Sequence, residues 1–356
     1  MIFRLVLICF LSACSSPAYY LQAGSGQLKL MRARQDIQSL LNSPATDSEL
    51  VSSLVAAEQI KSFAHNDLDL PDNGSYSSYV EVDGDALVWN VIATEEFSLE
   101  PKKWCFPVAG CVPYRGFFKQ QKAMDSAAHL RKKGLDVIVS PAAAYSSLGW
   151  FKDPLLSTML SGSNIRLAAY LFHELAHQRL YVKGDGVFNE GYASFVEQVG
   201  IKAWLEYNQR QDELLQWQQL QSAGQDFADL IGETRSSLNK LYLSDDTEVG
   251  KRKRKAEMFD SLLTSYNQLR IEKWQGERFY DGWFKEPLNN AKLALHNTYE
   301  GSHCAFKELF DRAEGDLKKF HLLAIQKSAL QKHERELWLK QSCVTIVASG
   351  EFKEKS

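Results

Sequence analysis

The chain has 356 residues, of which 45% are hydrophobic and 24% are charged, and its formal net charge is −3. A chain of this length and hydrophobic content can bury a substantial core, as one large domain or two modest ones, which excludes a disordered or fibrous protein. It has no overall positive charge of the kind that neutralises nucleic-acid phosphates, so we expect no nucleic-acid partner.

The N-terminus has the pattern of a secretion signal. Arg4 precedes the apolar run 5–11, which is too short to span a bilayer because a spanning helix needs about 20 residues. Leu11-Ser12-Ala13-Cys14 resembles the lipobox of bacterial lipoproteins. The resemblance implies that a signal peptide, residues 1–13, is removed and that Cys14 is acylated. An ordinary signal peptide, cut a few residues later, is the alternative.

The residue after the acylated cysteine bears on location. Ser15 stands there rather than an aspartate, which under the enterobacterial sorting rule indicates the outer membrane of a Gram-negative host. No later segment has 18 consecutive apolar residues, so we expect the mature chain to contact the membrane only through its lipid. The expected location is the bacterial cell envelope, on the periplasmic face of the outer membrane.

The first part of the mature chain, residues 14–163, combines helical and strand patterns. Apolar residues between 27 and 64 recur at three- and four-residue spacing with a break at 42–44, which predicts two helices. Segments rich in Tyr, Val and Ile predict strands, and Asp83-Gly84-Asp85 predicts a hairpin between the first two. The remaining predictions for this part are strands 76–82, 86–94, 112–118 and 136–140 and a helix 120–133.

Two cysteines in this part are candidates for a disulfide. Cys105 and Cys111 are six residues apart and flank Pro107 and Gly110, which can turn the chain back on itself. A compartment outside the cytoplasm permits disulfides. Metal binding by the two thiols is the weaker alternative, because their spacing matches no common zinc pattern.

Two helices follow in residues 164–205. The first is predicted over 164–182, with Ser163 or Asn164 as its N-cap and Gly184 just beyond its end. Asn189 is predicted to cap the second, which reaches about Leu205.

Long amphipathic helices are predicted in the C-terminal part, residues 206–356, which is rich in Gln, Glu, Leu and Lys up to Trp274. Ser244-Asp245-Asp246-Thr247 is the natural turn between two of them. The basic run Lys251–Lys255 is expected to form a solvated helix face. Contact with an anionic envelope component is the alternative.

The segment His173-Glu174-Leu175-Ala176-His177 carries the strongest chemical signal. Residues four apart on a helix lie one turn above another, so both imidazoles can bind one zinc ion. Glu174 is rotated about 100° from His173, which places its carboxylate beside the metal. There it can accept the proton of a water molecule that attacks a polarised carbonyl.

A catalytic zinc site needs a third protein ligand and an open fourth position. Glu190 follows His177 by thirteen residues, which is enough for one helix to end and a second to return a carboxylate to the metal. The alternative is a carboxylate that only favours the helix N-terminus electrostatically. We predict one Zn²⁺, held by His173, His177 and Glu190, with a peptide as the substrate.

These residues resemble the gluzincins, the metallopeptidases of thermolysin and the large aminopeptidases, whose third ligand is a glutamate on a following helix. Asn189-Glu190-Gly191-Tyr192-Ala193 is similar to their Asn-Glu-Gly-Phe-Ala context, although the spacing from His177 is shorter than usual.

A closer resemblance is to a bacterial family of lipoproteins described by motif as zinc aminopeptidases. The residue patterns predict an α+β fold with a small mixed sheet and a predominantly helical C-terminal half, and this resemblance implies a zincin-like metallopeptidase core. It also implies aminopeptidase activity. One departure is Gly191-Tyr192, where the family has Ser or Ala and then Phe. The blocks that carry the resemblance span nearly the whole mature chain: 19–23, 104–111, 114–118, 144–151, 172–178 and 288–293.

Peptide hydrolysis also needs a donor for the oxyanion that forms at the scissile carbonyl. The resemblance to gluzincins implies a Tyr or His from the C-terminal part, and Tyr299 is the candidate, with His296 beside it. A buried structural tyrosine is the alternative. Asn289 and Asn290 could bind substrate backbone or could cap and connect helices.

Three hypotheses of function remain. The first is a zinc aminopeptidase, and the second is an endopeptidase that acts on envelope proteins. The third is a non-catalytic lipoprotein that binds peptides or acts as a scaffold and holds a structural zinc. Four protein ligands would favour the third, whereas Glu174 opposes it because a structural site has no need of a carboxylate there.

Overall fold

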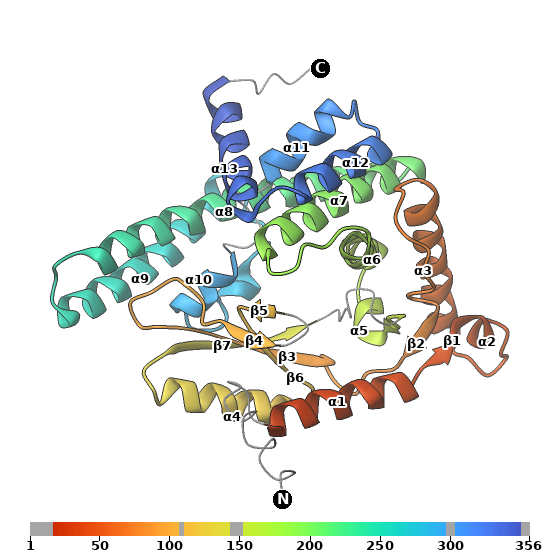
Figure 1. Cartoon of the computed structure of the whole chain (residues 1–356), viewed down its shortest axis with the longest axis horizontal. Helices are drawn as coiled ribbons and strands as arrows, with labels where there is room; N and C mark the ends of the chain where they lie inside the picture. Colours follow the sequence, from red (N-terminus) through yellow and green to blue (C-terminus); the bar gives the residue numbers. More distant parts are fainter. Residues whose placement is uncertain (1–16, 107–109, 143–151, 297–302, 350–356) are drawn as a thin grey trace, which may run out of the picture.

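Helices form most of the described part of the protein, which also contains two three-stranded sheets and one two-stranded sheet (Figure 1). The computed structural model describes residues 17–106, 110–142, 152–296 and 303–349. The predicted α+β class is confirmed. Over the described ranges, no helix is long and apolar enough to cross a membrane. Cys14, the segment 144–151 and Tyr299 lie outside the described residues.

Three helices open the chain: α1 (Pro17–Arg32), α2 (Ile37–Leu41) and α3 (Ser48–Asn66). The prediction of two helices with a break at 42–44 is confirmed for the break, but the first helix is divided, because the strand β1 (Gln35–Asp36) lies between α1 and α2. Asp47 caps α3 by accepting hydrogen bonds from the amides of Glu49 and Leu50. The buried face of α3 packs into the main hydrophobic core.

The predicted hairpin of 76–82 with 86–94 is wrong, because its two strands belong to different sheets. β2 (Ser78–Val80) lies between β1 and β8 (Leu155–Leu156), whereas β3 (Val88–Thr94) lies between β6 (Arg115–Phe117) and β7 (Asp136–Ala142). Both faces of β3 are buried, with Val91 on one face and Ile92 on the other at no more than 1% exposure. A strand covered on both faces favours the centre of a sheet over the edge of a hairpin.

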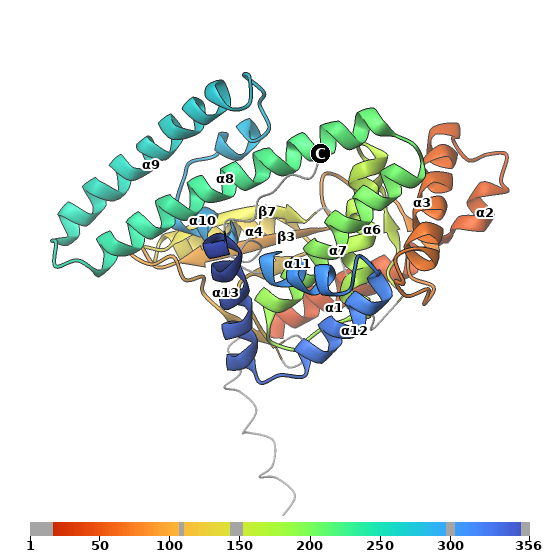
Figure 2. The same cartoon turned by 90° about the horizontal axis from the view of Figure 1, so that it is seen from above.

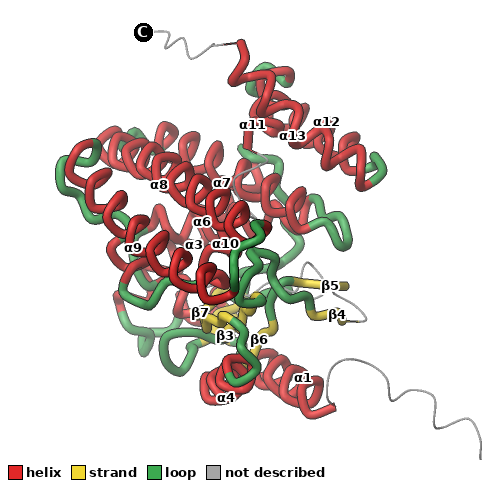
Figure 3. The backbone as a smooth tube through the Cα atoms, turned by 90° about the vertical axis from the view of Figure 1, so that its left-hand side faces the viewer, coloured by secondary structure: helices red, strands yellow, loops and turns green. Residues whose placement is uncertain are grey.

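Helices cover the two faces of the β6-β3-β7 sheet, as Figure 3 shows. The predicted helix 120–133 is α4 (Gln120–Arg131), which buries Ala123 and Ala127 on one face. On the other face, Ala291 of α10 (Asn290–His296) packs on Ile92 and Ile138. The predicted strand 136–140 is confirmed as β7.

A separate hairpin lies between β3 and β6 in the chain. β4 (Trp104–Phe106) pairs with β5 (Gly110–Val112), and a disulfide joins Cys105 to Cys111. The strand predicted over 112–118 is therefore two shorter ones, β5 and β6. Because Cys105 and Cys111 are direct cross-strand partners, the disulfide holds the register of the hairpin.

The centre of the molecule is a pair of helices, α6 (Asn164–Arg179) and α7 (Gly186–Tyr207), preceded by the short α5 (Ser157–Leu160). Ser163 caps α6, as predicted, by accepting a hydrogen bond from the Arg166 amide. The prediction that Asn189 caps the next helix is wrong. Asp185 caps α7 instead, so α7 begins four residues earlier and places Asn189 inside its first turn.

The long helices predicted in the C-terminal part are α8 (Gln211–Leu243) and α9 (Glu248–Glu272), joined at the predicted turn, and Figure 2 shows them side by side. An aromatic cluster fills the space between α8, α9 and the 3-10 helix η1 (Asp281–Phe284). Three helices then pack near α7: α11 (His303–Arg312), α12 (Leu317–Ser328) and α13 (Lys332–Ser349).

The basic run Lys251–Lys255 is in part the solvated face that we expected, because Arg252, Lys253 and Arg254 are exposed, but several of its residues also form ion pairs. The Arg252 guanidinium binds both oxygens of Glu96, at 2.7 and 2.9 Å, and Lys255 Nζ lies 2.6 Å from Asp136 Oδ2. Arg254 pairs with Asp246. These ion pairs connect α9 to the β6-β3-β7 sheet, because Glu96 follows β3 and Asp136 begins β7.

Candidate metal centre

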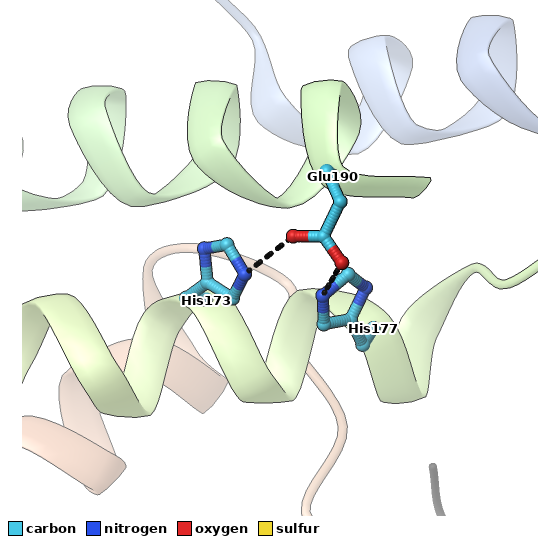
Figure 4. A group of neighbouring side chains, drawn as sticks. All are labelled: His173, His177 and Glu190. Atoms are coloured by element: carbon cyan, nitrogen blue, oxygen red, sulfur yellow. Dashed lines mark ion pairs between the residues drawn. The ribbon is translucent and has the colours of Figure 1, made fainter. Parts of the chain in front are cut away.

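Three predicted ligands meet between α6 and α7 (Figure 4). His173 Nε2 lies 3.4 Å from Glu190 Oε2, and His177 Nε2 lies 3.7 Å from Glu190 Oε1. The three ligand atoms all lie within 4.8 Å of one another. The two imidazoles are one turn apart on α6, and the carboxylate faces them from the first turns of α7.

The turn between the two helices sets the position of Glu190. The Asn189 side chain accepts a hydrogen bond from the Val182 amide at 2.7 Å and donates one to the Val182 carbonyl at 2.8 Å. Asn189 is 1% exposed. This side chain therefore fixes the returning chain from within α7, and the next residue, Glu190, faces the histidines.

A second contact holds the same turn. The Asp185 carboxylate accepts a hydrogen bond from the Phe188 amide and pairs with Arg335 of α13 at 2.8 Å. Asp185 and Arg335 are less than one-tenth exposed. Removal of one partner from such a buried pair is strongly destabilising, because the other charge is left without compensation.

The geometry fits a metal ion. Two imidazole nitrogens and a carboxylate oxygen are ligands that zinc prefers, and a tetrahedral centre with bonds of about 2.0–2.1 Å places its ligand atoms about 3.3 Å apart. The distances of 3.4 and 3.7 Å from Glu190 to the two histidines are close to that value. His177 is buried, at 6% exposure, whereas His173 and Glu190 are partly exposed and leave one side of the site accessible.

A fourth residue, Glu197, supports the site and was missed by the sequence analysis. The His173 Nδ1–H donates to Glu197 Oε2 at 3.0 Å, which leaves Nε2 directed toward Glu190. A carboxylate behind a ligand histidine fixes the orientation of its ring and increases its basicity. The available signal was the spacing, because Glu197 follows Glu190 by seven residues, two turns along the same face of α7.

The carboxylates set the charge of the site. Burial lowers the pKa of His173, but hydrogen bonds to Glu190 and Glu197 outweigh this effect and raise that pKa to about 10. Burial raises the pKa of Glu190, but the two imidazoles lower it to about 2. An imidazolium and a carboxylate therefore face each other at neutral pH, and a metal ion that binds there replaces a proton.

Three tyrosines surround the site, none of which the sequence analysis predicted there. The Tyr181 ring lies 6.3 Å from the His177 ring, edge to face. The surrounding protein and the Glu190 carboxylate raise the pKa of Tyr114 to about 12, although 41% of the residue is exposed. Burial and the Glu174 carboxylate raise the pKa of Tyr76. Glu174 is partly exposed on α6.

Other candidate residues have structural contacts. Asn289 caps α10 by accepting a hydrogen bond from the Lys292 amide, and Asn290 bonds to the Tyr242 hydroxyl and the Glu96 carbonyl. Both therefore connect helices to the sheet, which was the second of the two predicted roles. His296 ends α10, and Tyr299 lies beyond the described residues, so Tyr299 stays a prediction.

The sequence matches a family model described as "Putative aminopeptidase" over residues 18–339. The chain belongs to this family. No curated protein and no solved structure gave a significant match. Family membership supports a peptidase-like function for the chain.

Substitution of Glu197 tests its support of the metal site. We expect Glu197→Gln to weaken Zn²⁺ binding about 10- to 100-fold, because the ring of His173 loses its charged partner. Titration calorimetry with Zn²⁺ measures the change. Glu206→Gln, on an exposed turn of the same helix, is the matched control and should bind like the wild type. Equal affinity of the Glu197→Gln variant and wild type would show that Glu197 does not support the ligand.

The pKa of His173 predicts a pH dependence of metal binding. With its pKa raised to about 10, His173 holds a proton at pH 7 to 8.5, and that proton must leave when Zn²⁺ binds. The apparent association constant should therefore rise about tenfold per pH unit across this range. Competition with a chelator of known pH response measures it. A flat response above pH 7.5, as expected for an ordinary histidine with a pKa of about 6.5, would contradict the charge state.

Proposed function

We propose that this protein is a zinc-dependent peptidase, and specifically an aminopeptidase. The observation that carries the proposal is the convergence of His173, His177 and Glu190, with Glu174 on the same helix as the two histidines. Family membership supports the peptidase class and supplies the word aminopeptidase.

The residues have distinct roles in the proposed reaction. His173, His177 and Glu190 would hold one zinc ion, which when bound polarises a carbonyl and lowers the pKa of water to about 7. Glu174 accepts the proton of the attacking water and delivers it to the amine that leaves. Glu197 holds the His173 ring in place from behind. Tyr299 is the proposed donor to the oxyanion, outside the described residues.

The arrangement also supports the proposal of a zincin-like core. One helix contributes two histidines and the glutamate base, and the next helix returns with the third ligand, as the resemblance to gluzincins implied. The partly exposed site favours catalysis over the alternative of a scaffold with structural zinc, because three ligands leave one position for a substrate.

We further propose that the chain is attached to the bacterial envelope by lipid on Cys14, at the periplasmic face of the outer membrane. The N-terminal pattern of residues 1–15 supports this proposal. Mass spectrometry of the purified N-terminal peptide would detect an acylated Cys14.

The proposed activity is tested by Glu174→Gln. We expect the full-length wild type to hydrolyse aminoacyl-anilides and the variant to lose at least 100-fold in kcat while it retains one zinc, because the amide cannot accept a proton. Glu206→Gln is the matched control and should cleave normally.

A comparison of aminoacyl-anilides with blocked internal peptides as substrates separates the two peptidase hypotheses. Cleavage of aminoacyl-anilides indicates an aminopeptidase, and cleavage restricted to blocked internal peptides indicates an endopeptidase. If wild type and variant each bind one zinc and neither cleaves any substrate, the peptidase proposal is contradicted and the peptide-binding alternative gains support.

A further inference from the structure

We propose that Tyr76 is a positioning residue for Glu174, to which its hydroxyl donates a hydrogen bond in the working enzyme. This inference rests on the proposed peptidase function. Tyr76 is buried, has an unusual backbone conformation and belongs to a segment that packs near the turn of α6 that contains Glu174.

The segment 73–77 packs directly against α6. Asn73 Nδ2 donates to Gln178 Oε1 at 2.7 Å. Ser75 and Ser77 line one cavity together with Leu175, the residue that follows Glu174. The segment on either side of Tyr76 therefore lies along the part of α6 that contains Leu175 and Gln178, next to Glu174 in the helix.

The backbone of Tyr76 is fixed in a conformation that bulky residues avoid. Its φ is +58°, in the left-handed region. The Tyr76 amide donates to the Asp153 carbonyl at 2.6 Å, and the Ser77 carbonyl accepts from the Ile37 amide at 3.2 Å. Backbone strain of this kind persists only where neighbouring contacts hold it, and it is frequent at functional sites.

The Tyr76 hydroxyl is a buried hydrogen-bond donor without an acceptor among the described residues. Tyr76 is 1% exposed, and among the described residues its hydroxyl has no hydrogen-bond partner. A buried hydroxyl of this kind calls for an explanation, because almost all buried polar groups are paired. Burial raises the pKa of Tyr76 well above its ordinary value, and the nearby Glu174 and Asp153 carboxylates raise it further. The hydroxyl therefore keeps its proton at neutral pH and can donate it in a hydrogen bond.

The proposed hydrogen bond would give the two carboxylate oxygens of Glu174 different roles. One oxygen accepts the hydrogen bond from Tyr76, which fixes the rotation of the carboxylate, and the other remains free to accept a proton from water. Hydrogen bonds of catalytic groups are often long in the free enzyme and shorten only with substrate bound.

The test compares Tyr76→Phe with Tyr266→Phe in the full-length protein. Tyr266 is a buried tyrosine outside the site, and its hydroxyl donates to Asp281 Oδ1 at 2.6 Å. We expect Tyr76→Phe to lower kcat about 10- to 100-fold with KM, zinc content and melting temperature unchanged or improved, because no hydrogen bond of the folded protein is lost. Tyr266→Phe should show the opposite pattern, with a lower melting temperature and normal kcat.

Two results would overturn the inference. A normal kcat for Tyr76→Phe would show that the hydroxyl does not act on the base. Loss of zinc and of thermal stability together with activity would show that Tyr76 is only structural.

A second measurement does not depend on hydrolysis. In protein labelled with ¹³C at the tyrosine ζ carbon, the Tyr76 signal is assigned by its loss in Tyr76→Phe. We expect this signal to move in Glu174→Gln while the Tyr266 signal stays in place. If wild type cleaves nothing, the proposed function fails, and this shift still decides whether the two side chains interact. An unmoved Tyr76 signal would contradict the inference.

Discussion

The return of the chain from α6 to α7 is the constraint on which the rest of the structure depends. A single buried amide, that of Asn189, bonds to both backbone groups of Val182. The cap of α7, Asp185, is also the buried partner of Arg335 in α13. The residue that follows Asn189 is then carried to the two histidines of the preceding helix. The local chemistry of one turn therefore brings together the metal ligands and connects them to the C-terminal helices.

Excess negative charge around two imidazoles distinguishes this site from an ordinary histidine pair. Glu190 and Glu197 contact opposite nitrogens of His173, and both contribute to its raised pKa. Such a site attracts a proton or a divalent cation and, with a cation bound, approaches charge balance. Glu174, Tyr114 and Tyr181 are at least partly exposed near this site, where a substrate could approach.

Patterns close together in the sequence allowed the helix pair, the triad and the disulfide to be predicted, because each depends on local spacing. Contacts distant in the sequence were not predictable in the same way. The strands 78–80 and 88–94 are adjacent in the chain, yet the buried faces of the second one place it between two other strands. Arg252 and Lys255 are unremarkable in a basic run, but their acidic partners lie more than 100 residues away. Tyr76 is likewise 98 residues from Glu174 in the sequence.

X-ray absorption at the zinc edge of the zinc-loaded protein tests the central claim most directly. The account predicts one zinc per chain with two imidazole ligands and only nitrogen and oxygen neighbours at about 2.0–2.1 Å, and the loss of the bound zinc in Glu190→Ala. Sulfur at about 2.3 Å, or a closed site of four protein side chains, would contradict it. Either result would show that His173, His177 and Glu190 do not form an open catalytic centre.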